Sequence, residues 1–72
     1  MMITSYRLSK NTRVISENDD MSVLMDVAAT DAGKPLTWKD CSEVNSTYQF
    51  AFDGVGVDRK EYEITSFRKR TI

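Results

Sequence analysis

The 72-residue chain contains no histidine and a single cysteine, Cys41. One cysteine cannot form a disulfide within the chain. Most structural zinc sites are built from cysteine and histidine side chains, and this chain has only one of these residues. The Ser–His and Cys–His nucleophilic pairs are excluded because their base is missing. Cys41 itself is expected to be a small buried apolar residue. The sequence therefore predicts no metal and no cofactor.

Long apolar runs are also missing. No run exceeds three residues, as in Val23-Leu24-Met25, whereas a membrane-spanning helix needs about 20. The first residues have neither the basic segment nor the apolar stretch of a secretory signal. We therefore expect a cytoplasmic protein that does not enter a membrane.

The motifs that carry chemistry in other proteins are incomplete here. The Gly54–Gly56 segment lacks the third glycine and the strand–helix–strand context of a dinucleotide site. Residues 58–60, Asp-Arg-Lys, match only a fragment of a metal-dependent nuclease pattern, in a chain too short for such an enzyme core. We therefore expect no enzymatic activity.

The charges are segregated along the chain although the net charge is only −1. Residues 1–16 contain bases and no acid, residues 17–31 contain acids and no base, and residues 64–72 are again purely basic. Segregated charge indicates surfaces that contact a partner. We expect the acidic and basic surfaces to be separate. The candidate partner-binding residues are Arg7, Arg68, Lys69 and Arg70 on the basic side, and Asp19, Asp20 and Asp26 on the acidic side.

Patterning in the first half predicts two strands and a helix. Residues 2–8 alternate as a strand does, and residues 13–16 are a candidate returning strand. Residues 17–20 offer an N-cap next to an acidic first turn, and residues 20–31 place apolar side chains at helical spacing behind it, which favours a helix. Gly33 and then Pro35 supply the stop signal. The alternation within residues 23–29 also fits a strand, which is the alternative for this segment.

In the second half, Thr37 and Asp40 have the spacing of a capping box and predict a short helix over 38–44. Beyond it, aromatic residues alternate with smaller ones over residues 48–52, which is typical of a strand. The Asp53–Gly54 pair then predicts a two-residue hairpin turn.

The tight turn would place Phe52 opposite Val55 and Phe50 opposite Val57, with both phenylalanine rings buried on the inner face of the ribbon. The alternative is a wide loop over 53–60, with Phe52 opposite Tyr62 and Phe50 opposite Ile64. We favour the tight turn, because Asp-Gly suits the positive φ angles that it requires.

These elements predict one compact domain over residues 1–72 of the α+β class. We expect a small antiparallel sheet of three to five strands, with one main helix and one short helix on one face. The C-terminal strand is expected at an edge, where it would be open to a partner strand. A domain this small buries only about 60% of its unfolded surface, so a homodimer is a reasonable expectation.

The absence of catalytic motifs and the segregated charge favour a non-enzymatic protein-interaction module, an adaptor or inhibitor of a larger protein partner. Small phage-encoded and mobile-element modulators have this general character, although no motif assigns a family. Two alternatives stay open. One is a nucleic-acid-binding regulatory domain that uses the basic terminal strands, and the other is a structural subunit of a larger assembly.

Overall fold

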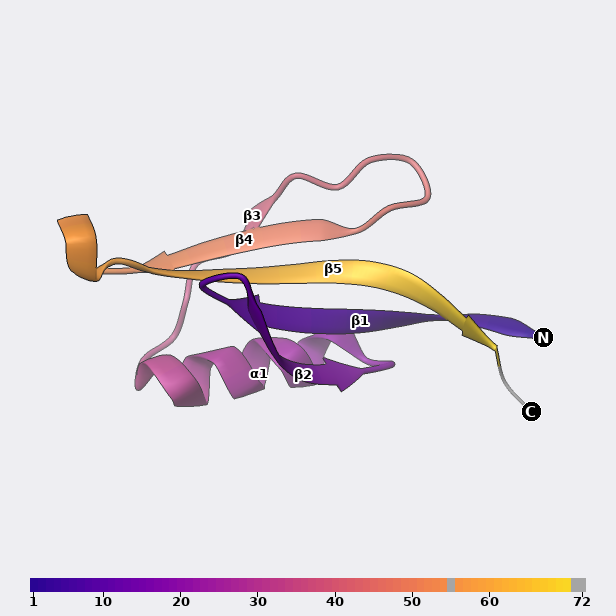
Figure 1. The fold of residues 1–72 in the computed structure, drawn as a ribbon, viewed down its shortest axis with the longest axis horizontal. Helices are drawn as coiled ribbons and strands as arrows, with labels where there is room; N and C mark the ends of the chain where they lie inside the picture. Colours follow the sequence, from indigo (N-terminus) through magenta and orange to yellow (C-terminus); the bar gives the residue numbers. More distant parts are fainter. Residues whose placement is uncertain (55, 71–72) are drawn as a thin grey trace.

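The structure, a computed structural model, describes residues 1–54 and 56–70. Over these residues the chain forms an α+β fold with a five-stranded antiparallel sheet and one α-helix (Figure 1). The strand order across the sheet is β2-β1-β5-β4-β3. Along the chain the elements are β1 (Met2–Lys10), β2 (Arg13–Asn18), α1 (Met21–Ala32), β3 (Lys39–Asp40), β4 (Tyr48–Asp53), the 3₁₀ turn η1 (Gly56–Asp58) and β5 (Lys60–Arg70).

Strand β5 lies at the centre of the sheet. It pairs with β1 from Lys10 opposite Tyr62 to Met2 opposite Arg70, and with β4 on its other side. The prediction that the C-terminal strand forms an edge is therefore wrong, because β1 and β4 occupy both of its edges. The edges of the sheet are β2 and the two-residue β3.

The helix predicted over 20–31 is confirmed as α1, and the strand alternative is wrong. Asp20 caps its N-terminus, since the carboxylate accepts a hydrogen bond from the Ser22 backbone N–H at 2.9 Å. Gly33 ends it with a left-handed φ of 76°, a conformation that glycine adopts without strain, and its N–H bonds back to the carbonyls of the last turn.

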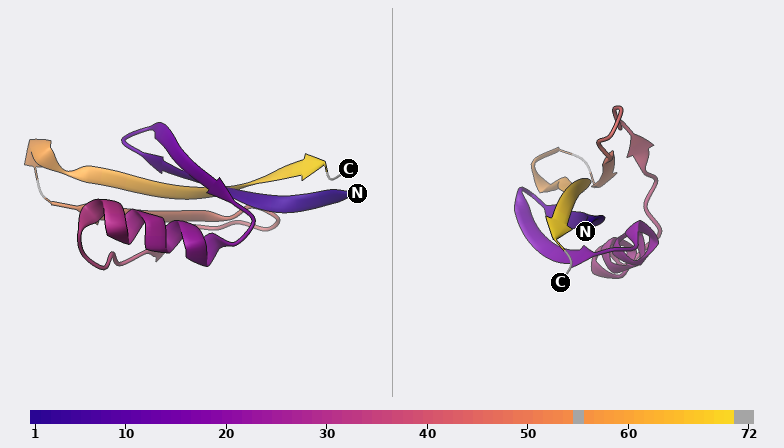
Figure 2. Two further views of the ribbon diagram at one scale, coloured as in Figure 1. Left: turned by 90° about the horizontal axis from the view of Figure 1, so that it is seen from below. Right: turned by 90° about the vertical axis from the view of Figure 1, so that its right-hand side faces the viewer.

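The helix packs on one face of the twisted sheet and forms the core with it (Figure 2). Leu24 and Ala28 of α1 are fully buried. Partly buried side chains, among them Tyr6 and Trp38, pack around this cluster. The sheet contributes Leu8, Ala51, Tyr62 and Ile64.

The short helix predicted over 38–44 is absent. Lys39 and Asp40 instead form β3 and pair with β4. The Asp40 carboxylate accepts from the backbone N–H of Ser42, two residues further along the chain, at 2.8 Å. The predicted capping box requires it to accept from the backbone N–H of Thr37 instead. Val44 is 89% exposed, so a helix here would have little to bury. Cys41, expected to be buried, is exposed.

The tight hairpin is also wrong. Strand β4 runs to Asp53, which pairs with Lys60, so the connection is a loop that includes η1; Val55 lies outside the described residues. Phe52 stands opposite Glu61 and Phe50 opposite Glu63, one residue away from the wide-loop alternative. A shift of one residue moves every side chain of a strand to the other face. The rings of Phe50 and Phe52, which were expected to be buried on the inner face, therefore lie on the face away from α1.

This register predicts unequal losses of stability for two truncations. Leu24→Ala should lower the free energy of unfolding by about 2–5 kcal/mol, because it opens a cavity in the core. Phe52→Ala should cost only about 1 kcal/mol, because the ring is already 48% exposed. Urea unfolding followed by circular dichroism measures both. Equal costs would contradict the observed register.

Candidate functional site

The sheet face opposite α1, here called the open face, carries a row of three rings along β4: Tyr48, Phe50 and Phe52. The Tyr48 and Phe50 ring centroids are 4.4 Å apart, and the Phe50 and Phe52 rings are parallel with centroids 6.3 Å apart. Within residues 1–54 and 56–70 no helix packs on this face. The rings, referred to below as the aromatic row, are therefore partly exposed.

A row of carboxylates lies beside the aromatic row on the central strand. Glu61 stands directly opposite Phe52, and Glu63 directly opposite Phe50. The pKa of the Tyr48 hydroxyl is raised, first by burial and then by the negative charge of Glu63 and a hydrogen bond to it. On the open face, a row of rings on β4 therefore lies beside a row of carboxylates on β5.

One cation already occupies this arrangement. The Arg59 guanidinium lies 4.7 Å from the centroid of the Phe52 ring, and its Nη2 is 3.3 Å from Oε1 of Glu61. Arg59 follows η1, so the loop between β4 and β5 folds its side chain back over the end of the aromatic row. Ring and carboxylate together stabilise the positive charge.

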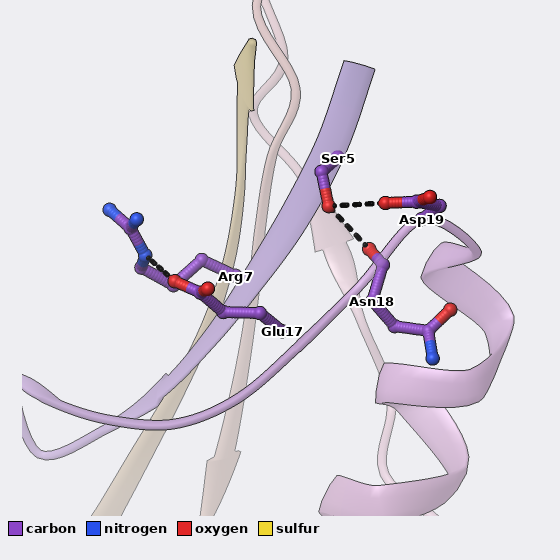
Figure 3. A network of polar contacts seen from close by, with 5 residues as sticks. All are labelled: Ser5, Arg7, Glu17, Asn18 and Asp19. Carbon is purple, nitrogen blue, oxygen red and sulfur yellow. Dashed lines mark hydrogen bonds and ion pairs between the residues drawn. The ribbon is translucent and has the colours of Figure 1, made fainter. Parts of the chain in front are cut away.

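A second cation is held in the same way across β1, β2 and β5. Nε of Arg7 donates to the Glu17 carboxylate at 2.6 Å (Figure 3). The same guanidinium lies 4.4 Å from the centroid of the Phe67 ring. Arg7 is a sequence-predicted site residue, and here its charge is satisfied within the fold.

Near Arg7, a polar network joins β1, β5 and the segment between β2 and α1. The hydroxyl oxygen of the buried Ser5 lies 2.8 Å from Oδ1 of Asp19 and 3.2 Å from the carbonyl oxygen of Asn18 (Figure 3). Nζ of Lys69 lies 2.9 Å from the same Asp19 oxygen. The ammonium of Lys69, and then the hydroxyl of Ser5, lower the pKa of Asp19. Because Asp19 and Lys69 meet, the predicted separation of acidic and basic surfaces does not hold.

The other sequence-predicted residues are dispersed. Arg68 and Arg70 pair with Thr4 and Met2, so strand alternation places them on the opposite face from Arg7. Arg68 lines a polar groove there, which Thr4 and the 42–47 loop also line. The two remaining acids are on α1 or at its start: Asp20 is the helix cap and Asp26 is exposed.

Sequence reasoning missed the aromatic and carboxylate rows as a surface. Their assignment depends on the face that β4 presents, and the Asp-Gly signal predicted a different register. The sequence signal that points to this surface is the even-numbered spacing of Tyr62 and Ile64, which places both side chains on one face of β5. Once these two are placed in the core, their β4 partners Ala51 and Gln49 share that face, and the rings of β4 point away from it.

Comparisons with models of protein families, with curated proteins and with solved structures gave no match. No helix in the described part of the chain is long and apolar enough to cross a membrane. Across residues 1–54 and 56–70, no three His, Cys, Asp or Glu side chains gather as they would around a metal ion.

The network predicts an acid-shifted titration for Asp19. Its folded pKa lies below the ordinary 3.8, so its contribution to stability is complete above the unfolded pKa of about 3.9 and is lost as the pH falls through the folded pKa. Lys69→Met should raise the Asp19 pKa, measured by NMR of the side-chain carboxyl carbon. Lys34→Met, which breaks the 2.6 Å pair with Asp53, is the matched control and should leave it unchanged. Identical Asp19 titrations in both variants would contradict the network.

Proposed function

We propose that this protein is a non-enzymatic protein-interaction module, an adaptor or inhibitor that docks on a larger protein through the β4–β5 half of its open face. The observation that carries the proposal is the aromatic row, which lies on the sheet face that α1 leaves uncovered, with Phe52 48% exposed. Aromatic side chains grouped on a surface are typical of interaction sites, where they supply large contact areas at low entropic cost.

Charge on the open face favours a protein over a nucleic acid. Exposed rings also stack on the bases of single strands, but such sites combine them with a basic groove. Here Glu61, which pairs with Arg59, and Glu63, which is in no ion pair among the described residues, lie beside the rings. The charge of Glu63 would repel a phosphate next to Phe50. The basic residues Arg68 and Arg70 lie on the other face.

A cytoplasmic location and an origin in a phage or mobile element remain part of this proposal. A homodimer and a structural subunit of a larger assembly are the other occupants or settings that would use an exposed aromatic row. The homodimer is an outcome that the experiment below separates from a distinct protein partner.

The test is affinity capture from an extract of the source cells, followed by mass spectrometry. The double variant Phe50→Ser/Phe52→Ser should lose most of the protein that the wild type captures, because both rings leave the surface. The matched control is Val23→Ser/Val44→Ser, which removes two exposed apolar side chains from α1 and from the β3–β4 loop. It should capture the same protein in the same amount.

Three results would contradict the proposal. The first is that the aromatic variant keeps the partner while Arg68→Glu/Arg70→Glu loses it, which would assign binding to the basic face. If the wild type also binds DNA or RNA in a salt-sensitive way, the partner would be a nucleic acid. The second is that only Asp26→Lys loses the partner, which would assign binding to the acidic side. Asp26 is substituted rather than Asp20 because Asp20 caps the helix. The third is a wild-type dimer in sedimentation that the aromatic variant dissociates.

A further inference from the structure

Two intramolecular sites on the open face hold a guanidinium in the same way. Arg59 contacts the Phe52 ring and the Glu61 carboxylate, and Arg7 contacts the Phe67 ring and the Glu17 carboxylate. In both, the cation combines a ring contact below 5 Å with a carboxylate contact below 3.5 Å. The open face therefore holds two of the chain's own arginine side chains, each in contact with one phenylalanine and one glutamate.

A second cross-strand pair like Phe52 and Glu61 holds no cation within the described residues. The Arg7 site is built differently, because Phe67 stands opposite Ser5 and Glu17 stands opposite Arg7 itself. Phe50 and Glu63 are direct cross-strand partners, next to the occupied Phe52 and Glu61 pair. Among residues 1–54 and 56–70, Glu63 takes part in no ion pair. The nearest strand position with positive charge is Lys39 of β3, which stands on the other side of Phe50 from Glu63.

We infer that the Phe50–Glu63 pair binds an arginine side chain of the partner, which reaches the open face on a basic peptide segment. This inference rests on the proposed function and names its chemistry. A guanidinium stacks flat on a ring while its N–H groups donate to a carboxylate, whereas a compact ammonium cannot do both equally well. The tilted Tyr48 ring, 4.4 Å from Phe50, borders the site. Its hydroxyl makes a hydrogen bond to Glu63, and the other lone pairs of the carboxylate accept from the guanidinium. Because ring and carboxylate act together, arginine is preferred over lysine.

The experiment uses a synthetic end-blocked peptide, Gly-Ser-Gly-Arg-Gly-Ser-Gly, titrated into the full chain and followed by backbone amide NMR. We expect saturable shifts that centre on Phe50 and Glu63. The same peptide with lysine should bind more weakly, and with citrulline, a neutral isostere of arginine, it should not bind measurably. These two peptides separate guanidinium recognition from general attraction between charges.

Two conservative variants test the two halves of the site. Phe50→Leu keeps the apolar volume and removes the ring, and Glu63→Gln keeps the shape and removes the charge. Each should weaken peptide binding about fivefold or more, as expected when one of two contacts to a cation is lost. Glu43→Gln, the same charge change in the exposed β3–β4 loop, is the matched control and should leave the affinity unchanged.

Several results would overturn the inference. One is that the citrulline or lysine peptide binds as tightly as the arginine peptide, and another is that Phe50→Leu or Glu63→Gln leaves the affinity for the arginine peptide unchanged. The others are NMR shifts centred on another surface and a ten-residue oligo-dT that binds at Phe50 more tightly than the peptide does. If the captured protein still depends on the aromatic row while the arginine peptide fails to bind, only this inference falls. If the peptide binds as expected but capture ignores the aromatic row, the proposed function falls instead.

Discussion

The burial of Tyr62 is the constraint on which the rest of the structure depends. This residue lies on the central strand, is fully buried, and its hydroxyl donates to Asp31 at the end of α1 at 2.7 Å. Asp31 also accepts from Lys10 of β1 at 2.7 Å. Burial, and then Asp31, raise the pKa of Tyr62, while Lys10 and Tyr62 lower that of Asp31. One side chain thus ties helix and sheet together and determines which face of the sheet is covered.

The open face is the consequence of that choice. With Tyr62 and Ile64 turned toward α1, their neighbours Glu61 and Glu63 must point the other way, and so must the rings opposite them. On the β1–β2 side, charges and hydroxyls satisfy one another within the chain, as Asp19 and Lys69 do. On the β4–β5 side Arg59 covers the Phe52 end of the aromatic row, whereas Phe50 and Glu63 hold no cation among the described residues. The two halves of one face therefore differ in their capacity to bind a partner.

Much of the fold could be predicted from local sequence, because its signals act over a few residues. The cap at Asp20 and the stop at Gly33 bound the helix in the sequence as in the structure. The register of β4 was predicted wrongly, because the Asp-Gly turn signal is local, whereas the register depends on how the loop after Asp53 closes and on which aromatic residue fills the core. For the same reason the candidate site was missed: the exposure of Phe52 is a tertiary fact, and its residue type alone favours burial.

The central position of β5 has a consequence for how the chain reaches its native state. Its longest pairing joins β1, which begins at residue 2, to a strand that ends at residue 70. The β1–β2 hairpin and the β4–β5 hairpin are local, but even the β1–β5 pair nearest in sequence, Lys10 and Tyr62, closes the chain between these two residues into a long loop. Folding speed falls as contacts become more distant in sequence, to about milliseconds to seconds in sheet proteins. This small domain is therefore expected to fold as slowly as a β-barrel or β-sandwich, with the docking of its two hairpins as the rate-limiting step.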